Sequence, residues 1–138
     1  PVSTPISVAF VCTHNACRSQ IAEALARRLA SGVIEAYSAG TNPAPEVNRD
    51  AIRVLNGRFG IDASSQRPKG ISDIPSVDVV VTMGCGVACP QLPAIHREDW
   101  GLEDPTGKGD EAIASTIEEV RRHVLDLKER ALAGELGR

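Results

Sequence analysis

The sequence predicts an α/β fold with a mostly parallel sheet, and three observations lead to this class. Apolar, β-branched runs alternate along the chain with stretches of helical periodicity, which implies right-handed crossovers between parallel strands. Val77–Val81 is a near-continuous β-branched run, the pattern of a strand covered on both faces. A length of 138 residues with 42% hydrophobic residues suits one domain, residues 1–138, with a single core.

The first strand and first helix have the clearest patterns. Val8–Val11 predicts a buried strand, and a helix is expected from about Arg18 to Ala30. Its apolar residues recur at helical spacing. Three charged residues of this helix are expected to face water: Glu23, Arg27 and Arg28.

The remaining elements follow from periodicity and turn residues. We expect a second strand over 33–40, a second helix from Pro45 or Glu46 to about Phe59, a strand over 77–81, a short strand around 92–96, a polar loop over 99–110 and a last helix over 111–133. Residues 61–73 are turn-prone and receive no assignment. Polar loops follow three of the strands, and the carboxyl ends of parallel strands share one edge of a sheet, so we expect a single site there.

The loop after the first strand carries a candidate nucleophile. Cys12 begins this loop, Arg18 closes it and Ser19 follows. A strand that leads directly into a helix leaves free backbone N–H groups, which bind oxyanions and stabilise a thiolate. The Arg18 guanidinium suits two oxygens of a tetrahedral anion. We therefore predict that Cys12 attacks a bound oxyanion. A purely packed cysteine is the alternative, and that is our interpretation of Cys17.

Composition excludes several classes of protein. The net charge is −3 and no basic run is present, which argues against nucleic acid as a partner. No apolar stretch has the length of a membrane span or resembles a signal peptide, so we expect a cytoplasmic protein without a membrane partner. In a reducing compartment, four cysteines are expected to be catalytic or redox-active.

Cys85 and Cys89 follow the valine-rich strand and predict redox chemistry. Gly84 and Gly86 flank Cys85 and give the backbone the freedom that a moving thiol needs. A zinc half-site is the alternative, but Cys12 and Cys17 do not supply the paired spacing that zinc requires, and we predict no metal site. Thiol exchange among three sulfurs is ordinary chemistry.

Two further residues are candidates near the anion loop. Pro105 biases Asp104 towards an extended conformation, and a carboxyl group near the anion could protonate a leaving oxygen. A solvated loop aspartate is the alternative for Asp104. His14 lies within the anion loop and could tune it.

These motifs resemble a known family. CTHNACRSQ at 12–20, SAG at 38–40 and WGLEDPTGK at 100–108 are similar to the low-molecular-weight tyrosine phosphatase fold. The cysteine pair after VVVTM at 79–83 resembles its thioredoxin-coupled arsenate reductase branch. The resemblance covers about residues 8–131 and implies a single-domain, three-layer sandwich with a four-stranded parallel sheet.

The resemblance also implies a role for each site residue. Cys12 would attack arsenate, Arg18 would bind the anion, Asn15 would brace the loop, Ser19 would stabilise the thiolate and Asp104 would act as general acid. The substrate-binding loop would comprise Thr13, His14, Asn15, Ala16, Cys17 and Arg18. Cys85 would then release arsenite by forming a Cys12–Cys85 disulfide, and Cys89 would take over Cys85 to give a disulfide that thioredoxin reduces.

The chain departs from the family pattern at three points. His14 stands where the reductases usually have glycine, and the Cys85–Cys89 spacing is shorter than in other members. Some members bind potassium near residues that match Asn15, Glu23 and Ser38. Lys69 aligns near a further ligand of that ion, which predicts an ammonium in its place and no potassium requirement.

Other functions remain open at this point. A phosphatase would use Cys12, Arg18 and Asp104 alone, and a thiol protein that binds arsenic without turnover would use the cysteines only. Mycothiol or glutathione could replace thioredoxin as the reductant. We expect arsenate as substrate, phosphate or sulfate as competing oxyanions, no tightly bound cofactor and a monomer.

Overall fold

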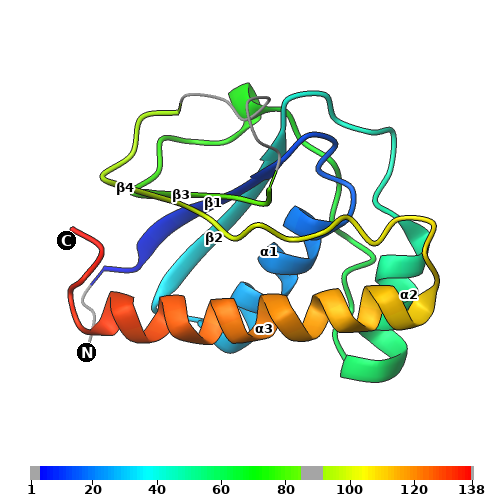
Figure 1. Ribbon diagram of the computed structural model, residues 1–138. Coiled ribbons are helices and arrows are strands. Elements are labelled where there is room, and N and C mark those ends of the chain that lie inside the picture. The colour runs from blue at the N-terminus through cyan, green and yellow to red at the C-terminus, as the bar shows by residue number, and fades with distance from the viewer. Residues whose placement is uncertain (1–3, 85–91, 138) are drawn as a thin grey trace.

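Four parallel strands form one sheet in the order β2–β1–β3–β4. The computed structural model describes residues 4–84 and 92–137 (Figure 1). The strands are β1 (Ile6–Cys12), β2 (Ile34–Gly40), β3 (Val79–Thr82) and β4 (His96–Asp99). The helices are α1 (Arg18–Leu29), α2 (Arg49–Phe59) and α3 (Asp110–Leu132), with a short 3₁₀ helix η1 (Ile71–Asp73). The predicted α/β class and four-stranded parallel sheet are confirmed.

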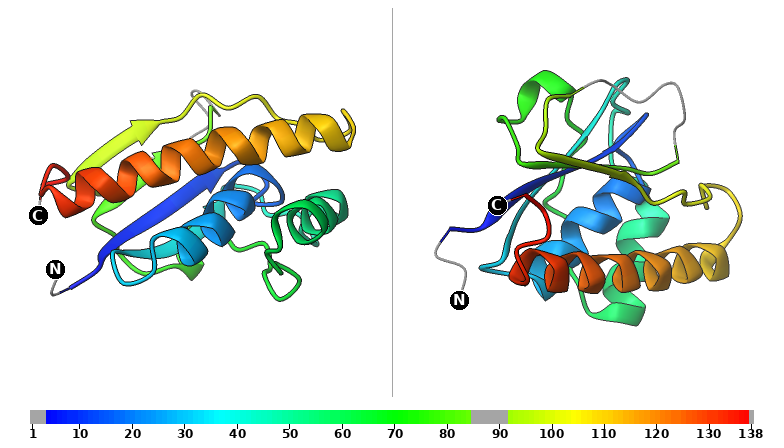
Figure 2. Two further views of the ribbon diagram at one scale, coloured as in Figure 1. Left: turned by 90° about the horizontal axis from the view of Figure 1, so that it is seen from below. Right: turned by 60° about the vertical axis from the view of Figure 1, so that its left-hand side comes forward.

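The two faces of the sheet are covered differently. Successive side chains of a strand point to opposite faces, so Val8 and Phe10 of β1 join the core under the helices. Ala9 and Val11 form a smaller cluster on the other face, against residues of η1 and its flanking segments. Figure 2 shows α1, α2 and α3 together on one side of the sheet. The sandwich therefore has a thick helical layer and a thin irregular layer.

Several element boundaries differ from the sequence prediction: β1 and β3 are shifted or extended by one or two residues, and α2 and β4 begin later than predicted. Helix α2 begins at Arg49, because the Asn48 side chain accepts a hydrogen bond from the Ala51 N–H and caps the helix there. Strand β4 covers His96–Asp99 and not residues 92–96, because its polar residues pair with β3 at the sheet edge. The apolar Leu92 and Ala94 instead pack on the smaller cluster.

The prediction that Glu23 faces water is wrong. Its side chain is only 2% exposed on the inner side of α1, whereas Arg27 and Arg28 are exposed as predicted. Helical spacing alone does not distinguish Glu23 from the two arginines, because Glu23 is buried by contacts with polar residues from other segments, which are described below. None of the helices in the described part of the chain is long and apolar enough to cross a membrane.

Candidate active site

The anion loop, defined as residues 12–18, joins β1 to α1 at the carboxyl edge of the sheet. Three of its carbonyl groups face outwards: those of Thr13, His14 and Ala16 accept hydrogen bonds from the N–H groups of residues 42, 44 and 48. The loop N–H groups from residues 13 to 18 donate to no other residue that the structure describes. Unpaired donors at the start of a helix bind anions, so the loop has the geometry of an oxyanion site.

The end of β2 holds the loop closely. A side chain at Gly40 would place its Cβ only 2.6 Å from the Thr13 carbonyl oxygen and 2.9 Å from the Asn15 nitrogen. Only glycine fits at this close backbone approach. The SAG motif found in the sequence therefore has a steric role in shaping the anion loop.

A chain of hydrogen bonds leads from Asn15 to the thiol of Cys12. The backbone N–H of Lys69 donates to Asn15 Oδ1 at 2.8 Å, which fixes the orientation of the amide. The Asn15 Nδ2 group therefore donates to Ser19 Oγ at 2.8 Å. The Ser19 hydroxyl hydrogen is then left for Cys12 Sγ, 2.9 Å away. The hydrogen bonds of Asn15 thus direct the Ser19 hydroxyl hydrogen towards the Cys12 sulfur.

Asn15 also adopts an unusual backbone conformation. Its φ of 50° makes it a non-glycine residue in the left-handed region, where asparagine is tolerated best among ordinary residues. The side chain is fully buried, and Gln20 Nε2 donates to its Oδ1 at 2.9 Å and to the Arg67 carbonyl at 2.9 Å. The strained residue is thus fixed by several buried hydrogen bonds.

A buried carboxylate lies behind this network. Glu23 accepts from the Ser38 hydroxyl, and Arg27 Nη1 lies 2.9 Å from Glu23 Oε2. Lys69 Nζ lies 3.5 Å from Glu23 Oε1 and 3.4 Å from Ser38 Oγ, and it donates to the Arg67 carbonyl at 2.8 Å. Two cations compensate one buried anion, which satisfies the requirement that a buried charge be paired. The lysine lies where the sequence predicted an ammonium.

Arg18 connects the anion loop to two distant loops. Its Nη1 donates to the Met83 carbonyl at 2.6 Å and to the Leu102 carbonyl at 3.0 Å. Met83 follows β3, and Leu102 precedes Asp104. A guanidinium has five N–H donors, so Nε and Nη2 still have hydrogens for an anion in the cavity that Arg18 lines.

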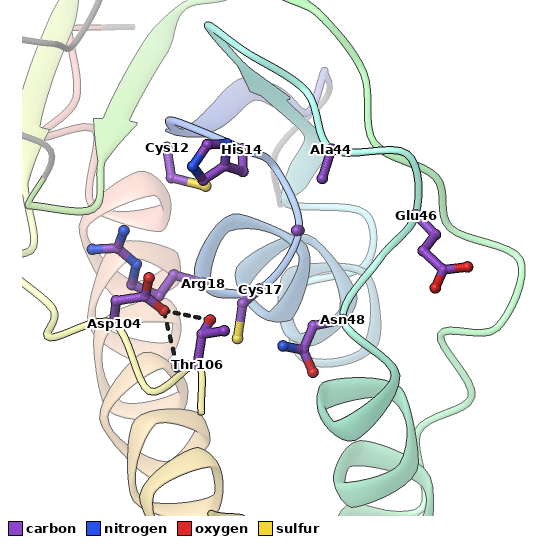
Figure 3. Close-up of a pocket in the computed structure, with 10 residues that line it drawn as sticks. Cys12, His14, Cys17, Arg18, Ala44, Glu46, Asn48, Asp104 and Thr106 are labelled. Atoms are coloured by element: carbon purple, nitrogen blue, oxygen red, sulfur yellow. Dashed lines mark hydrogen bonds between the residues drawn. The ribbon is translucent and has the colours of Figure 1, made fainter. Parts of the chain in front are cut away.

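A cavity of about 460 Å³ opens above the loop, lined by residues from three segments: Cys12, His14, Ala16, Cys17, Arg18, Ala44, Glu46, Asn48, Asp104 and Thr106. Figure 3 shows the Asp104 carboxylate and the Arg18 guanidinium on the same side of this cavity. The structure thus brings Asp104 to the same cavity as Cys12 and Arg18, although Asp104 lies 92 residues after Cys12 in the chain. Thr13, Asn15 and Ser19 lie in or directly beneath the loop.

Asp104 is an ionised group in this arrangement. Partial burial disfavours its charge, but the hydroxyl and N–H of Thr106 donate to Oδ1 at 2.7 and 3.1 Å. These bonds, together with the charges of Arg18 and His14, hold the pKa of Asp104 below its ordinary value. An approaching dianion would oppose this charge and favour proton uptake by the carboxylate.

Cys17 differs from Cys12 although both are buried. Burial, followed by the charge of Asp104, raises the pKa of the Cys17 thiol to about 12. The thiol is therefore neutral, in keeping with the interpretation of Cys17 as a packing residue. It forms part of the helical core and of the cavity wall.

Cys85 and Cys89 lie outside the described residues. Sequence reasoning missed Thr106, although the Asp-Pro-Thr spacing is typical of an aspartate that accepts from the residue two positions ahead. It also missed the carbonyl groups of Met83 and Leu102, which leave no signal in a sequence.

Among the described residues, no cluster of His, Cys, Asp or Glu could hold a metal ion.

Comparison with known proteins gives consistent findings. A family model described as low molecular weight phosphotyrosine protein phosphatase matches residues 7–136. An arsenate reductase of Staphylococcus aureus is 33% identical over 132 residues, which cover 92% of this chain and 99% of that protein. A glutaredoxin arsenate reductase of Synechocystis sp. is 37% identical over 125 residues, covering 87% and 94%.

Solved structures agree with these relatives. An arsenate reductase in the phosphate binding state superposes with a TM-score of 0.83 at 35% identity, covering 91% of this chain and 98% of that one. The thioredoxin-dependent arsenate reductase of Corynebacterium glutamicum gives 0.77 at 35% identity, covering 97% and 65%. A low molecular weight protein tyrosine phosphatase of T. tengcongensis gives 0.77 at 32% identity, covering 91% and 99%.

Proposed function

Because this chain belongs to the low molecular weight phosphotyrosine protein phosphatase family, we propose that it is an arsenate reductase of that fold, acting in arsenic detoxification. Cys12 is the nucleophile, and Thr13, His14, Asn15, Ala16, Cys17 and Arg18 form the oxyanion-binding loop. The observation that carries this proposal is the hydrogen-bonded series Asn15–Ser19–Cys12 at the base of a loop with unpaired N–H groups. The names of the relatives support arsenate as the substrate.

In the first step, the Cys12 thiolate attacks arsenic, an As–S bond forms and an As–O bond breaks. The loop N–H groups and the free donors of Arg18 stabilise the charge on the remaining oxygens. Asp104, which takes up a proton when the anion enters, acts as a general acid at the mouth of the cavity. Phosphate and sulfate are competing oxyanions, because they have the same shape and similar charge.

In the second and third steps, the other cysteines supply the electrons. Cys85 attacks Cys12 Sγ, an S–S bond forms, and the As–S electron pair reduces As(V) to arsenite. Cys89 then attacks Cys85 and frees Cys12, leaving a Cys85–Cys89 disulfide. The contact of Arg18 with Met83 supports this route, because Met83 lies only two residues before Cys85.

We propose thioredoxin as the reductant of the final disulfide, which requires no tightly bound cofactor. The thioredoxin-dependent neighbour supports this choice. The glutaredoxin-linked relative favours a small-thiol route as the second candidate. In the thioredoxin route both electrons pass through the chain's own cysteine pair.

The test is turnover of arsenate with thioredoxin, thioredoxin reductase and NADPH, for the native chain and for Cys89→Ser. We expect steady NADPH consumption by the native chain and its loss in the variant. Consumption that persists in the variant would mean that the second disulfide is dispensable. Failure with thioredoxin but turnover with glutathione or mycothiol would replace the reductant and keep the reaction.

A phosphatase is the second candidate function. The tyrosine phosphatase neighbour and the family description favour it, and Trp100 is the one aromatic residue near Asp104 in the sequence. Against it, none of the described residues that line the cavity is a Phe, Tyr or Trp. Hydrolysis of an aryl phosphate without any arsenate reduction would select the phosphatase.

A further inference from the structure

The peptide group between Met83 and Gly84 is held at both of its ends. Its carbonyl oxygen, which belongs to Met83, accepts a hydrogen bond from Arg18 Nη1 at 2.6 Å. Its N–H, which belongs to Gly84, donates to Asp99 Oδ1 at 2.7 Å. A trans peptide group is planar, and its C=O and N–H point in opposite directions. Asp99 and Arg18 therefore lie on opposite sides of one rigid unit that connects them.

The sheet register sets the position of Asp99. Where β3 pairs with β4, Thr82 lies opposite Asp99. The Thr82 hydroxyl donates to Asp99 Oδ1 at 2.6 Å, so the oxygen that accepts from Gly84 accepts a second hydrogen bond. The Trp100 N–H donates to the Thr82 carbonyl at 2.9 Å. Together these bonds hold the carboxyl group of Asp99 against the end of β3.

The second carbonyl partner of Arg18 lies against the same peptide group. Leu102 supplies this carbonyl, which accepts from Arg18 Nη1 at 3.0 Å. A Cβ added at Gly84 would lie only 3.1 Å from the Leu102 carbonyl oxygen and 3.3 Å from Gly101 Cα, so the two backbone segments are in close contact. A shift of the 83–84 peptide group would therefore disturb both acceptors of Arg18 Nη1.

The orientation of Arg18 depends on these two acceptors. Nη1 has two hydrogens, and the two carbonyl groups accept them, which leaves Nε and Nη2 for an anion. Because a guanidinium is planar and rigid, fixing Nη1 also fixes the direction of the other donors. The carboxyl group of Asp99 also polarises the 83–84 peptide group and makes the Met83 carbonyl a stronger acceptor. Donors that are oriented in advance lose less entropy when they bind a ligand.

We infer that Asp99 is a positioning residue for oxyanion binding. It acts through the 83–84 peptide group and holds Arg18 in the orientation in which Nε and Nη2 are available to the anion. Asp99 itself is not among the described residues that line the cavity. The inference rests on the part of the proposed function that assigns Arg18 to the oxyanion.

Two variants separate position from charge. Asp99→Asn keeps an oxygen that can accept from Gly84 and Thr82 but removes the negative charge, whereas Asp99→Ala removes both. A negative charge near the cavity opposes anion binding. If Asp99 acted through its charge alone, both variants would bind an anion more tightly than the native chain. If it positions Arg18, Asp99→Ala weakens binding and Asp99→Asn does not.

The measurement is the dissociation constant of inorganic phosphate, determined by calorimetry on the reduced full chain. We expect Asp99→Ala to raise this constant about 5- to 20-fold and Asp99→Asn to remain within about 2-fold of native. Asp99→Thr, which suits an exposed strand position but is too short to reach Gly84, should behave like Asp99→Ala. Native or tighter binding by the Ala and Thr variants, or equal weakening in the Asn variant, would overturn the inference.

Asp78 provides a matched control for a merely structural effect. Its Oδ2 accepts from the N–H and the hydroxyl of Ser7, both at 3.1 Å, and it directly precedes β3 at the opposite edge of the sheet. Asp78→Ala should therefore lower the resistance to urea and leave the dissociation constant of phosphate within about 2-fold of native. If Asp78→Ala weakens phosphate binding as much as Asp99→Ala, the effect is a general loosening of the sheet and the inference fails.

Phosphate binding keeps this test separate from that of the proposed function, because it requires no turnover of the cysteines. If the native chain binds phosphate but reduces no arsenate with any thiol, the proposed function fails, and the dissociation constants of the variants still decide the role of Asp99. A native chain that binds no phosphate would contradict both the assignment of Arg18 to the oxyanion and the role of Asp99.

Discussion

The two sides of the anion loop differ in how their polar groups are satisfied. The inner wall, defined as Asn15, Ser19 and Gln20, is at most 1% exposed, and its members hydrogen-bond to one another. The mouth, defined as His14, Glu46, Asp104 and Thr106, is exposed or half-buried and carries ionisable groups whose protons can exchange with solvent. The inner wall therefore sets the position of the thiolate, whereas the mouth controls charge and protons. We expect substitutions in the wall to affect stability and rate together, and those in the mouth to affect mainly the rate.

We expect the largest effect from substitution of Cys12, the nucleophile, which lies between the inner wall and the mouth. Cys12→Ser should lower arsenite formation by about 10⁴-fold or more, because a serine hydroxyl is a far weaker nucleophile for arsenic than a thiolate. Cys17→Ala is the matched control and should keep activity within about 5-fold, since its buried thiol stays neutral. Comparable losses in both variants would contradict the separate roles of the two cysteines.

Asn15 tests the inner wall. Asn15→Ala leaves the Lys69 N–H unpaired and removes one hydrogen bond each from the Gln20 amide and the Ser19 hydroxyl. Unpaired buried groups cost about 1–3 kcal/mol each, so urea unfolding should show a loss of about 3 kcal/mol, with activity reduced about 100-fold. A substitution within about 0.5 kcal/mol of native would contradict a structural role for the wall.

Asn15→Asp is the control for this variant. It keeps the oxygen that accepts from Lys69 but turns the second group from a donor into an acceptor. The Ser19 hydroxyl would then donate to the new carboxylate and no longer to Cys12 Sγ. We expect the activity loss to exceed what the change in unfolding free energy explains.

Asp104 tests the mouth. Asp104→Asn should lower kcat/KM about 10- to 100-fold by removing a proton carrier. The pKa of Asp104 is lowered in the folded state, so its charge stabilises the fold above the ordinary carboxyl pKa, and this contribution is lost as pH falls through the lowered value. Because the group is largely exposed, the substitution should cost under about 1 kcal/mol at neutral pH and nothing in strong acid.

Thr106→Val sharpens this prediction. The valine removes the hydroxyl donor at 2.7 Å and keeps the N–H donor. The pKa of Asp104 should rise towards its ordinary value, as measured by NMR titration of the carboxyl carbon. An unchanged pKa would show that Arg18 and His14, and not Thr106, set the charge of Asp104.

The smallest effect concerns the cation behind the wall. Since Lys69 Nζ lies beside Glu23 and Ser38, exchanging sodium for potassium should leave the activity and the melting temperature of the native chain unchanged. Lys69→Ala removes the ammonium and should lower stability by about 1–2 kcal/mol. Activation of the native chain by potassium would contradict the role of the Lys69 ammonium as a replacement for that ion.

The sequence predicted the parts of the site that depend on local pattern. Cys12, Arg18 and Ser19 are recognisable because a strand that leads into a helix leaves its N–H groups free, whatever the rest of the fold. The buried strands were also predicted, since runs of β-branched residues favour strands. Asp104 needed the resemblance to a family, because a single loop aspartate carries no local signal.

Other features depend on contacts that no local pattern records. Strand β4 is polar because it lies at the sheet edge, so its hydrogen bonds to β3 and not its side chains define it. Glu23 has the spacing of a surface residue and is buried only because Lys69, Arg27 and Ser38 surround it. The carbonyl partners of Arg18 come from loops 65 and 84 residues away.

The most direct test of the central claim is a single turnover without external reductant. The reduced chain is mixed with one equivalent of arsenate, and arsenite and free thiols are counted. We predict one arsenite per chain with the loss of two thiols, and a Cys85–Cys89 disulfide in the peptide map of the native protein. Arsenite formed without thiol loss, or no arsenite from a chain that binds phosphate, would contradict a reductase that draws both electrons from its own cysteines.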